Sequence, residues 1–197
     1  EKLRANGHST VPIHSADAVT IPTAMHAFAK MSDTWGKLGF DTLLEPTITY
    51  ADEGVPVAPR VAFDWIEAAP SLQGRAKDHY LVNGKVPKTG DIFRAPGQAE
   101  VLRRVAKEGV KAFYEGEIAD DMLAALQAHG GAHTSEDFAG VSSEQTTPVS
   151  GNYKGIDLFE HPPNGQGATA ILMLNILKNF DIAAMDPFGK QRAHIEA

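Results

Sequence analysis

Residues 153–180 constrain the fold more than any other stretch of the chain. Residues 155–160 alternate apolar and polar side chains, and this pattern predicts a strand with one buried face. Residues 168–180 are apolar on almost every side of a helix, so we expect a helix buried within a layered core. The segment is therefore predicted to be a strand that leads through a short loop into a core helix.

The loop between these two elements, residues 161–167, is the candidate binding site. Two consecutive prolines end the strand because proline has no N–H group for the ladder, and two glycines permit a tight turn. The free N–H groups at the start of a helix can face a polar ligand. We therefore predict that Asn164 and Gln166 bind substrate. A helix cap without a binding role is the alternative for Asn164.

The composition is ordinary for a globular protein, with 43% hydrophobic and 22% charged residues. The formal net charge of −7 and the lack of a basic run argue against a nucleic-acid partner. No apolar run reaches the roughly 18 residues that a membrane-spanning helix needs. The absence of cysteine removes disulfides, thiolate nucleophiles and cysteine metal ligands, and it leaves the compartment open between cytoplasm and periplasm.

The rest of the chain reads as helices followed by a hairpin. Apolar spacing, prolines and glycines predict helices at about 24–35, 40–54, 58–69, 98–114 and 117–129. A short capped turn follows at 134–138. Strands are predicted at about 142–149 and 153–160, joined by a loop at 150–152, and a smaller hairpin at 80–82.

The two ends and the even composition bear on domain organisation. The chain starts at Glu1 rather than Met and ends in a helical run over residues 191–197, so we expect it to be part of a longer protein. No shift in composition marks a boundary. Residues 1–197 are therefore predicted to belong to one domain, with no second domain.

Common catalytic motifs are missing from the sequence. There is no GxSxG nucleophile turn, no phosphate-binding GxxxxGK[ST] loop and no HExxH metal motif. Gly165 and Gly167 resemble part of a dinucleotide-binding turn, but Ile171 stands where that pattern needs a third glycine. His129 and His133 are separated by two glycines, which break the helix that would align their rings on a metal. The residues alone therefore identify no catalytic group, metal site or cofactor.

Several segments nevertheless resemble, in the same order, the large subunit of gamma-glutamyltranspeptidase-like enzymes. These segments are residues 18–24, 43–57, 88–102, 107–119, 130–138 and 153–155. The most distinctive are LLEPTITYADEGVPV at 43–57 and KEGVKAFYEGEIA at 107–119. One departure lies in the candidate loop, where residues 161–167 read HPPNGQG and the family usually has PPPSSGG. Two of the prolines and the last glycine are kept, and the serine pair is replaced.

The resemblance implies an α+β fold, the four-layer αββα fold of N-terminal-nucleophile hydrolases, of which this chain is a mostly helical part with a few strands. It implies a precursor that cleaves itself, so that a new N-terminal Thr on a small subunit attacks a gamma-glutamyl or other small amide, such as glutathione. That Thr lies downstream of residue 197 in the family and the substrate-carboxylate arginine lies upstream of the matched region. The implied partners are therefore the small subunit and the amide substrate, and the isolated chain is predicted to be inactive.

Two alternatives stay open. The replaced serine pair resembles a side branch of amidohydrolases or acylases as much as the strict glutathione enzymes, so the substrate is not settled by the resemblance. A non-catalytic helical binding or scaffold domain is the alternative from another class, because no catalytic residue is assigned within the chain.

Overall fold

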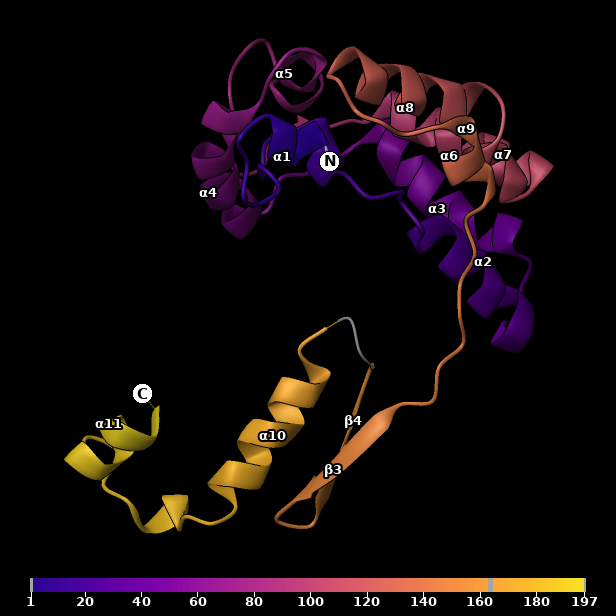
Figure 1. Ribbon diagram of the computed structural model, residues 1–197. Helices are drawn as coiled ribbons and strands as arrows, with labels where there is room; N and C mark the ends of the chain where they lie inside the picture. The colour runs from indigo at the N-terminus through magenta and orange to yellow at the C-terminus, as the bar shows by residue number, and fades with distance from the viewer. Residues whose placement is uncertain (1, 163–164, 197) are drawn as a thin grey trace. The chain divides into compact units, whose positions relative to one another are not determined.

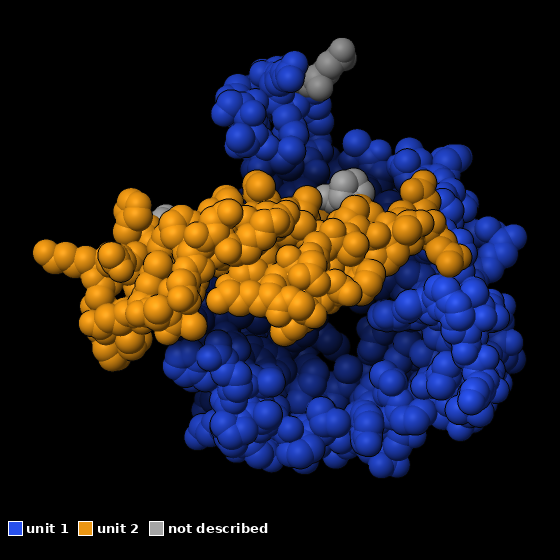
Figure 2. All heavy atoms as spheres, turned by 90° about the horizontal axis from the view of Figure 1, so that it is seen from below, with its two compact units in different colours: residues 1–143 blue, residues 144–197 orange. Residues whose placement is uncertain are grey.

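The computed structural model describes residues 2–162 and 165–196. Backbone contacts divide the chain into two compact units, unit 1 with residues 1–143 and unit 2 with residues 144–197 (Figure 2). The prediction that all of these residues belong to one domain stays a prediction. No helix in the described residues is long and apolar enough to cross a lipid bilayer.

The regular elements of unit 1 are mostly helices, joined by loops (Figure 1). Its helices are α1 (Lys2–Ala5), α2 (Ala24–Trp35), α3 (Phe40–Glu53), α4 (Pro59–Ala68), α5 (Arg75–Tyr80), α6 (Pro96–Glu108), α7 (Lys111–Tyr114), α8 (Glu117–Ala128) and α9 (Ser135–Ala139). Short 3-10 turns are η1 (Ala16–Ala18) and η2 (Ala69–Ser71), and its two-residue strands are β1 (Val55–Pro56) and β2 (Ile92–Phe93).

The core of unit 1 lies between α3 and α6. Leu44 from α3 packs with Leu102 and Val105 from α6, and all three are buried. Partly buried hydrophobic residues surround this cluster: Met25, Phe40, Ile48, Ala106 and Phe113. Burying a leucine side chain stabilises a fold by roughly 1.5–3 kcal/mol. These residues come from four helices, α2, α3, α6 and α7, so the cluster holds the helical layer of unit 1 together.

Two helices of unit 1 are capped at their starts in different ways, one by adjacent residues and one by a residue distant in sequence. Thr134 and Asp137 form a reciprocal capping box at the start of α9, which confirms the predicted capped turn. At the start of α2, Thr23 makes no side-chain cap bond. Instead the buried Tyr114 hydroxyl, from α7, accepts a hydrogen bond from the backbone N–H of His26 at 3.0 Å. A distant tyrosine therefore performs the capping role.

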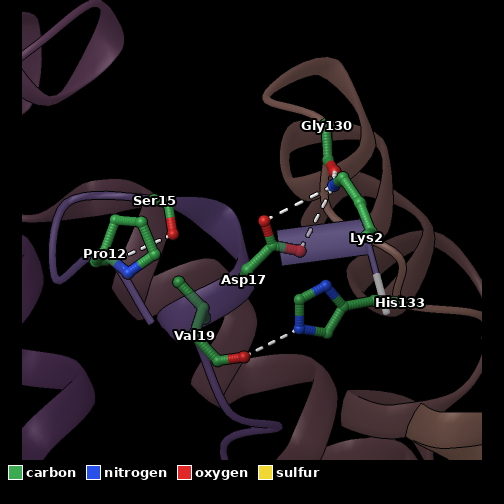
Figure 3. A network of polar contacts seen from close by, with 7 residues as sticks. All are labelled: Lys2, Pro12, Ser15, Asp17, Val19, Gly130 and His133. Carbon is green, nitrogen blue, oxygen red and sulfur yellow. Dashed lines mark hydrogen bonds and ion pairs between the residues drawn. The ribbon is translucent and has the colours of Figure 1, made fainter. Parts of the chain in front are cut away.

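A second polar network joins the first residues of the chain to the end of α8 (Figure 3). Lys2 Nζ donates to the Gly130 carbonyl oxygen at 2.6 Å and lies 3.3 Å from a carboxylate oxygen of Asp17 in η1. His133 Nε2 donates to the Val19 carbonyl oxygen at 2.7 Å, because a carbonyl can only accept (Figure 3). His133 therefore has a structural hydrogen bond.

Unit 2 consists of a hairpin and the helices that follow it (Figure 1). Its elements are β3 (Val149–Tyr153), β4 (Ile156–Glu160), α10 (Gly167–Leu177), η3 (Ile182–Ala184) and α11 (Lys190–Glu196). The two strands are antiparallel, with Val149 opposite Glu160 and Tyr153 opposite Ile156. Helix α10 packs against both strands, with more contact to β3.

The predicted hairpin is correct in kind and wrong in register. Residues 142–148 form no strand, and residues 150–152, predicted as the loop, belong to β3 and pair with β4. The actual turn is Lys154-Gly155, where both residues have positive φ, 52° and 84°. A two-residue turn of this kind matches the right-handed twist of paired strands. The Asn152 amide reinforces it by donating to Asp157 Oδ1 at 2.7 Å.

The burial predicted for the helix over residues 168–180, which corresponds to α10, is wrong for the described chain. Leu172, Met173 and Ile176 on α10 are 60%, 54% and 53% exposed. The reason is that a two-stranded hairpin is too narrow to cover more than one face of a helix. The strand-to-helix order itself is confirmed by β4 and α10.

Residues 71–96 differ most from the sequence-based expectation. Residues 75–80 form helix α5, so Tyr80 ends a helix, and the expected hairpin is reduced to one bridge between Val82 and Lys85. Strands β1 and β2 pair antiparallel and were not predicted. Each has only two residues, which is too short for an alternating pattern to be recognised.

Candidate functional site

The candidate site is the junction at which β4 ends and α10 begins. Glu160 is the last residue of β4 and Gln166 directly precedes α10. Pro163 and Asn164 lie outside the described residues, so the predicted role of Asn164 has no structural counterpart here. Of the two predicted site residues, Gln166 lies within the described part of the chain.

Gln166 presents its side chain to solvent. Its backbone carbonyl oxygen accepts the first hydrogen bond of α10, from the Ala170 N–H at 2.8 Å. Its side chain makes no capping bond to the helix, and the residue is exposed. A primary amide can donate through nitrogen and accept through oxygen. The Gln166 amide therefore lies beside the start of α10, exposed and without a capping bond to the helix.

Gly167 allows β4 and α10 to meet closely. It is buried, and a Cβ atom at this position would lie 2.6 Å from Glu160 Cβ and 3.1 Å from the His161 carbonyl oxygen. The 2.6 Å contact is shorter than real Cβ atoms essentially ever make, so any residue with a Cβ would push the helix from the strand end. The glycine therefore brings Glu160 and the first turn of α10 together.

Glu160 is the charged residue of this junction, and the sequence analysis did not select it. It is half-buried, and its Oε2 atom lies 3.2 Å from the position a Cβ of Gly167 would take. The positive end of a helix dipole stabilises a nearby carboxylate. An acid at a strand end just before a helix start was the available signal. The junction thus combines a carboxylate acceptor with the amide of Gln166.

The histidines considered as metal ligands have other surroundings. His129 follows the last residue of α8, and His133 is bonded to Val19 as described above. His161, beside the candidate loop, donates from Nδ1 to the Pro162 carbonyl oxygen at 3.2 Å. Within residues 2–162 and 165–196, no three His, Asp or Glu side chains are grouped closely enough to hold a metal ion.

The sequence of the chain is similar to those of a known protein family. The sequence profile of the Gamma-glutamyltranspeptidase family matches residues 1–197. A relative, the glutathione hydrolase-like YwrD proenzyme of Bacillus subtilis (strain 168), is 33% identical over 193 residues, which are 96% of this chain and 37% of the relative. Its name marks it as a proenzyme.

Two solved structures share the fold. Cephalosporin acylase from Bacillus halodurans has a TM-score of 0.87 and 32% identity, covering 99% of this chain and 38% of that protein. The gamma-glutamyltranspeptidase of Helicobacter pylori has a TM-score of 0.85 and 26% identity, covering 94% of this chain and 55% of the matched one. The chain therefore spans well under two thirds of the length of these proteins.

These similarities confirm the predicted fold class and the resemblance on which it rested. The chain is a mostly helical part, with a few strands, of the four-layer αββα fold of N-terminal-nucleophile hydrolases. Because the profile match extends over residues 1–197, the chain belongs to the gamma-glutamyltranspeptidase family.

Proposed function

We propose that residues 1–197 are part of the large subunit of a gamma-glutamyltranspeptidase-like amide hydrolase or acyltransferase. The observation that carries this proposal is the family match over residues 1–197, which includes both unit 1 and unit 2. The relative from Bacillus subtilis is named a proenzyme, which supports a precursor that is processed. The chain itself then serves as scaffold and contributes to the substrate cleft.

The chemistry of the complete enzyme is proposed to start from a Thr outside residues 1–197. Self-cleavage frees the α-amine of this Thr, and the amine takes the proton of the Thr hydroxyl as the oxygen attacks the amide carbonyl. Backbone N–H groups stabilise the oxyanion, and the same proton leaves with the departing amine. Water then releases the acyl group as an acid, or an acceptor amine takes it in transfer. The proposed partner of this chain is the small subunit that carries the Thr.

Asn164 and Gln166 are proposed to lie near the acyl-binding cleft of the complete enzyme. The exposed amide of Gln166 supports this placement, because it is not engaged in capping α10. A gamma-glutamyl group carries both an ammonium and a carboxylate. Amide N–H groups suit the carboxylate, and the neighbouring Glu160 suits the ammonium.

A related amidohydrolase or acylase is the second candidate. The loop sequence HPPNGQG at residues 161–167 favours it, since the serine pair usual in the family is replaced. The similarity to a cephalosporin acylase supports the same possibility. A gamma-glutamyl anilide and a glutaryl anilide distinguish the two candidates in the full-length protein, because they differ only in the α-amino group. Selective turnover of the first supports the gamma-glutamyl enzyme, and equal or reversed preference supports the acylase.

The mechanism is tested on the full-length precursor and on a variant in which the Thr at the proposed self-cleavage site is replaced by Ala. Intact-mass analysis should show two polypeptides for the precursor and one for the variant, and only the cut protein should hydrolyse an anilide. A single uncut polypeptide that still turns over an amide would refute the mechanism. An uncut, inactive full-length protein would instead favour the non-catalytic scaffold. The isolated 197-residue chain should show no more turnover than a mock preparation.

A further inference from the structure

We propose that His26 and Lys30 of α2 hold Ser143 in a clasp that restrains the chain where it leaves unit 1. His26 Nδ1 and Ser143 Oγ are joined by a hydrogen bond of 2.7 Å. Lys30 Nζ donates to the Ser143 carbonyl oxygen, also at 2.7 Å. The clasp is defined by these three residues and their two bonds, and it is independent of the proposed catalysis.

The spacing on α2 explains how both residues reach one target. Positions four apart in a helix lie on the same face, one turn above the other. His26 therefore holds the Ser143 side chain while Lys30 holds its backbone. A serine hydroxyl both donates and accepts, so it can pair with the imidazole in either neutral tautomer. Ser143 is therefore held by two hydrogen bonds from chemically different groups, an imidazole and an ammonium.

The His26 half of the clasp is built on a rigid base. Its backbone N–H donates to the Tyr114 hydroxyl at 3.0 Å, and its ring meets the Tyr114 ring edge-on with centroids 6.3 Å apart. Tyr114 is only 5% exposed. Since the buried Tyr114 side chain holds the first turn of α2, the position of the His26 imidazole does not depend on its bond to Ser143. The exposed Lys30 supplies the more flexible half.

The position of Ser143 in the chain gives the clasp its consequence. Ser143 is the last residue of unit 1. Residues 144–148 belong to no helix or strand of the described chain, and β3 starts at Val149. Without the two bonds, the unrestrained stretch would begin near Val141, whose N–H bonds to Phe138 at 3.2 Å. The clasp therefore shortens the free linker from its unit 1 end.

Hydrogen–deuterium exchange of the full-length protein tests this role. Ser143→Ala removes the side-chain bond and Lys30→Met removes the backbone bond while keeping the aliphatic stem. Each lost bond should speed exchange in a peptide over residues 140–149 about fivefold, the factor for a typical net hydrogen bond, through fraying of the Gly140 and Val141 amides, which bond to the Glu136 and Phe138 carbonyls. The double variant should exceed either single one. Ser143→Thr, which keeps the hydroxyl, should retain most of the protection.

Matched controls come from neighbouring exposed residues. Ser142→Ala and Lys37→Met change the same residue types, and neither side chain has a recorded hydrogen bond in the described structure. Both should leave exchange of the 140–149 peptide unchanged. The proposal is overturned if the double variant exchanges like these controls. It is also overturned if exchange rises equally throughout α2, α3 and α6, because the bonds would then support the whole unit.

Discussion

The hydroxyl of Tyr114 donates to the carbonyl oxygen of Pro22 at 2.8 Å, across 92 positions of sequence. The same oxygen accepts from the His26 N–H. One buried side chain therefore bonds to the backbone just before α2 and to the backbone of its first turn. Because Thr23 makes no side-chain cap bond, the bond from the His26 N–H takes over side-chain capping of that helix. It also connects α7 to α2 and supports the His26 half of the clasp.

Tyr114→Phe should lower the free energy of unfolding by about 1–3 kcal/mol. The phenyl ring fills the same space, but the His26 N–H is left without its partner in a partly buried position. Urea unfolding followed by circular dichroism measures the change. Tyr50→Phe is the control, since Tyr50 is 62% exposed and should tolerate the same substitution. Equal effects of the two substitutions would show that the hydroxyl of Tyr114 contributes nothing.

The stability of the chain should fall at alkaline pH partly because of Tyr114. Burial raises the pKa of Tyr114, and the hydrogen bond from the His26 amide lowers it by a smaller amount. The folded state therefore holds the phenol proton to a higher pH than the unfolded state, whose pKa is about 10. This contribution is complete below pH about 10 and is lost as pH rises through the folded pKa. Unfolding free energies from pH 8 to 11 should decline less steeply in Tyr114→Phe. Parallel curves would contradict the prediction.

Gly167→Ala should destabilise unit 2 although alanine favours helices. Helix propensity alone would stabilise the variant by up to about 1 kcal/mol. The new Cβ would lie 2.6 Å from Glu160 Cβ, and overpacking of this kind costs about 1–3 kcal/mol. Gly165→Ala is the matched control, because a Cβ there meets nothing within 4 Å. Thermal melts of the full-length variants give the comparison. A Gly167→Ala protein at least as stable as the control would mean that the strand and helix ends are not in contact.

Asn164→Ala and Gln166→Ala should each lower kcat/KM of the complete enzyme about tenfold if they contact the acyl group. A hydrogen bond to a charged group contributes about 1.5–3 kcal/mol. Loss of a helix cap at residue 164 would instead cost about 1 kcal/mol of stability. Gln98→Ala, an exposed glutamine on α6, is the control. If both variants melt earlier but keep their specificity constants, the two residues are structural and the cleft assignment is wrong.

Much of the helical structure could be predicted because its signals are local. The apolar spacing and the flanking Gly or Pro residues of α2, α3, α4 and α8 lie within the helices or next to them. The strand-to-helix order of β4 and α10 was likewise visible in residues 155–180. The family resemblance extended these local patterns to a fold class, and the structural similarities confirm it.

The candidate site was only partly visible in the sequence. The loop with Asn164 and Gln166 could be selected because prolines and glycines mark it. Glu160 was not selected, since its proximity to Gly167 depends on how closely β4 and α10 approach. The hairpin turn was misplaced for a similar reason: residues 150–152 contain turn-forming types, yet they pair across the ladder with residues of β4. Strand register is decided by the partner strand.

The sequence by itself determined most helices of unit 1, the strand-to-helix order of β4 and α10, and the family. Only the tertiary structure decided which distant groups meet: Tyr114 with Pro22, His26 with Ser143, and β1 with β2. It also left the apolar face of α10 exposed beside a narrow hairpin. A local pattern records which face of a helix or strand is apolar. Hydrogen bonds between residues about a hundred positions apart leave no such pattern, because any polar residue brought to the right place by packing can form them.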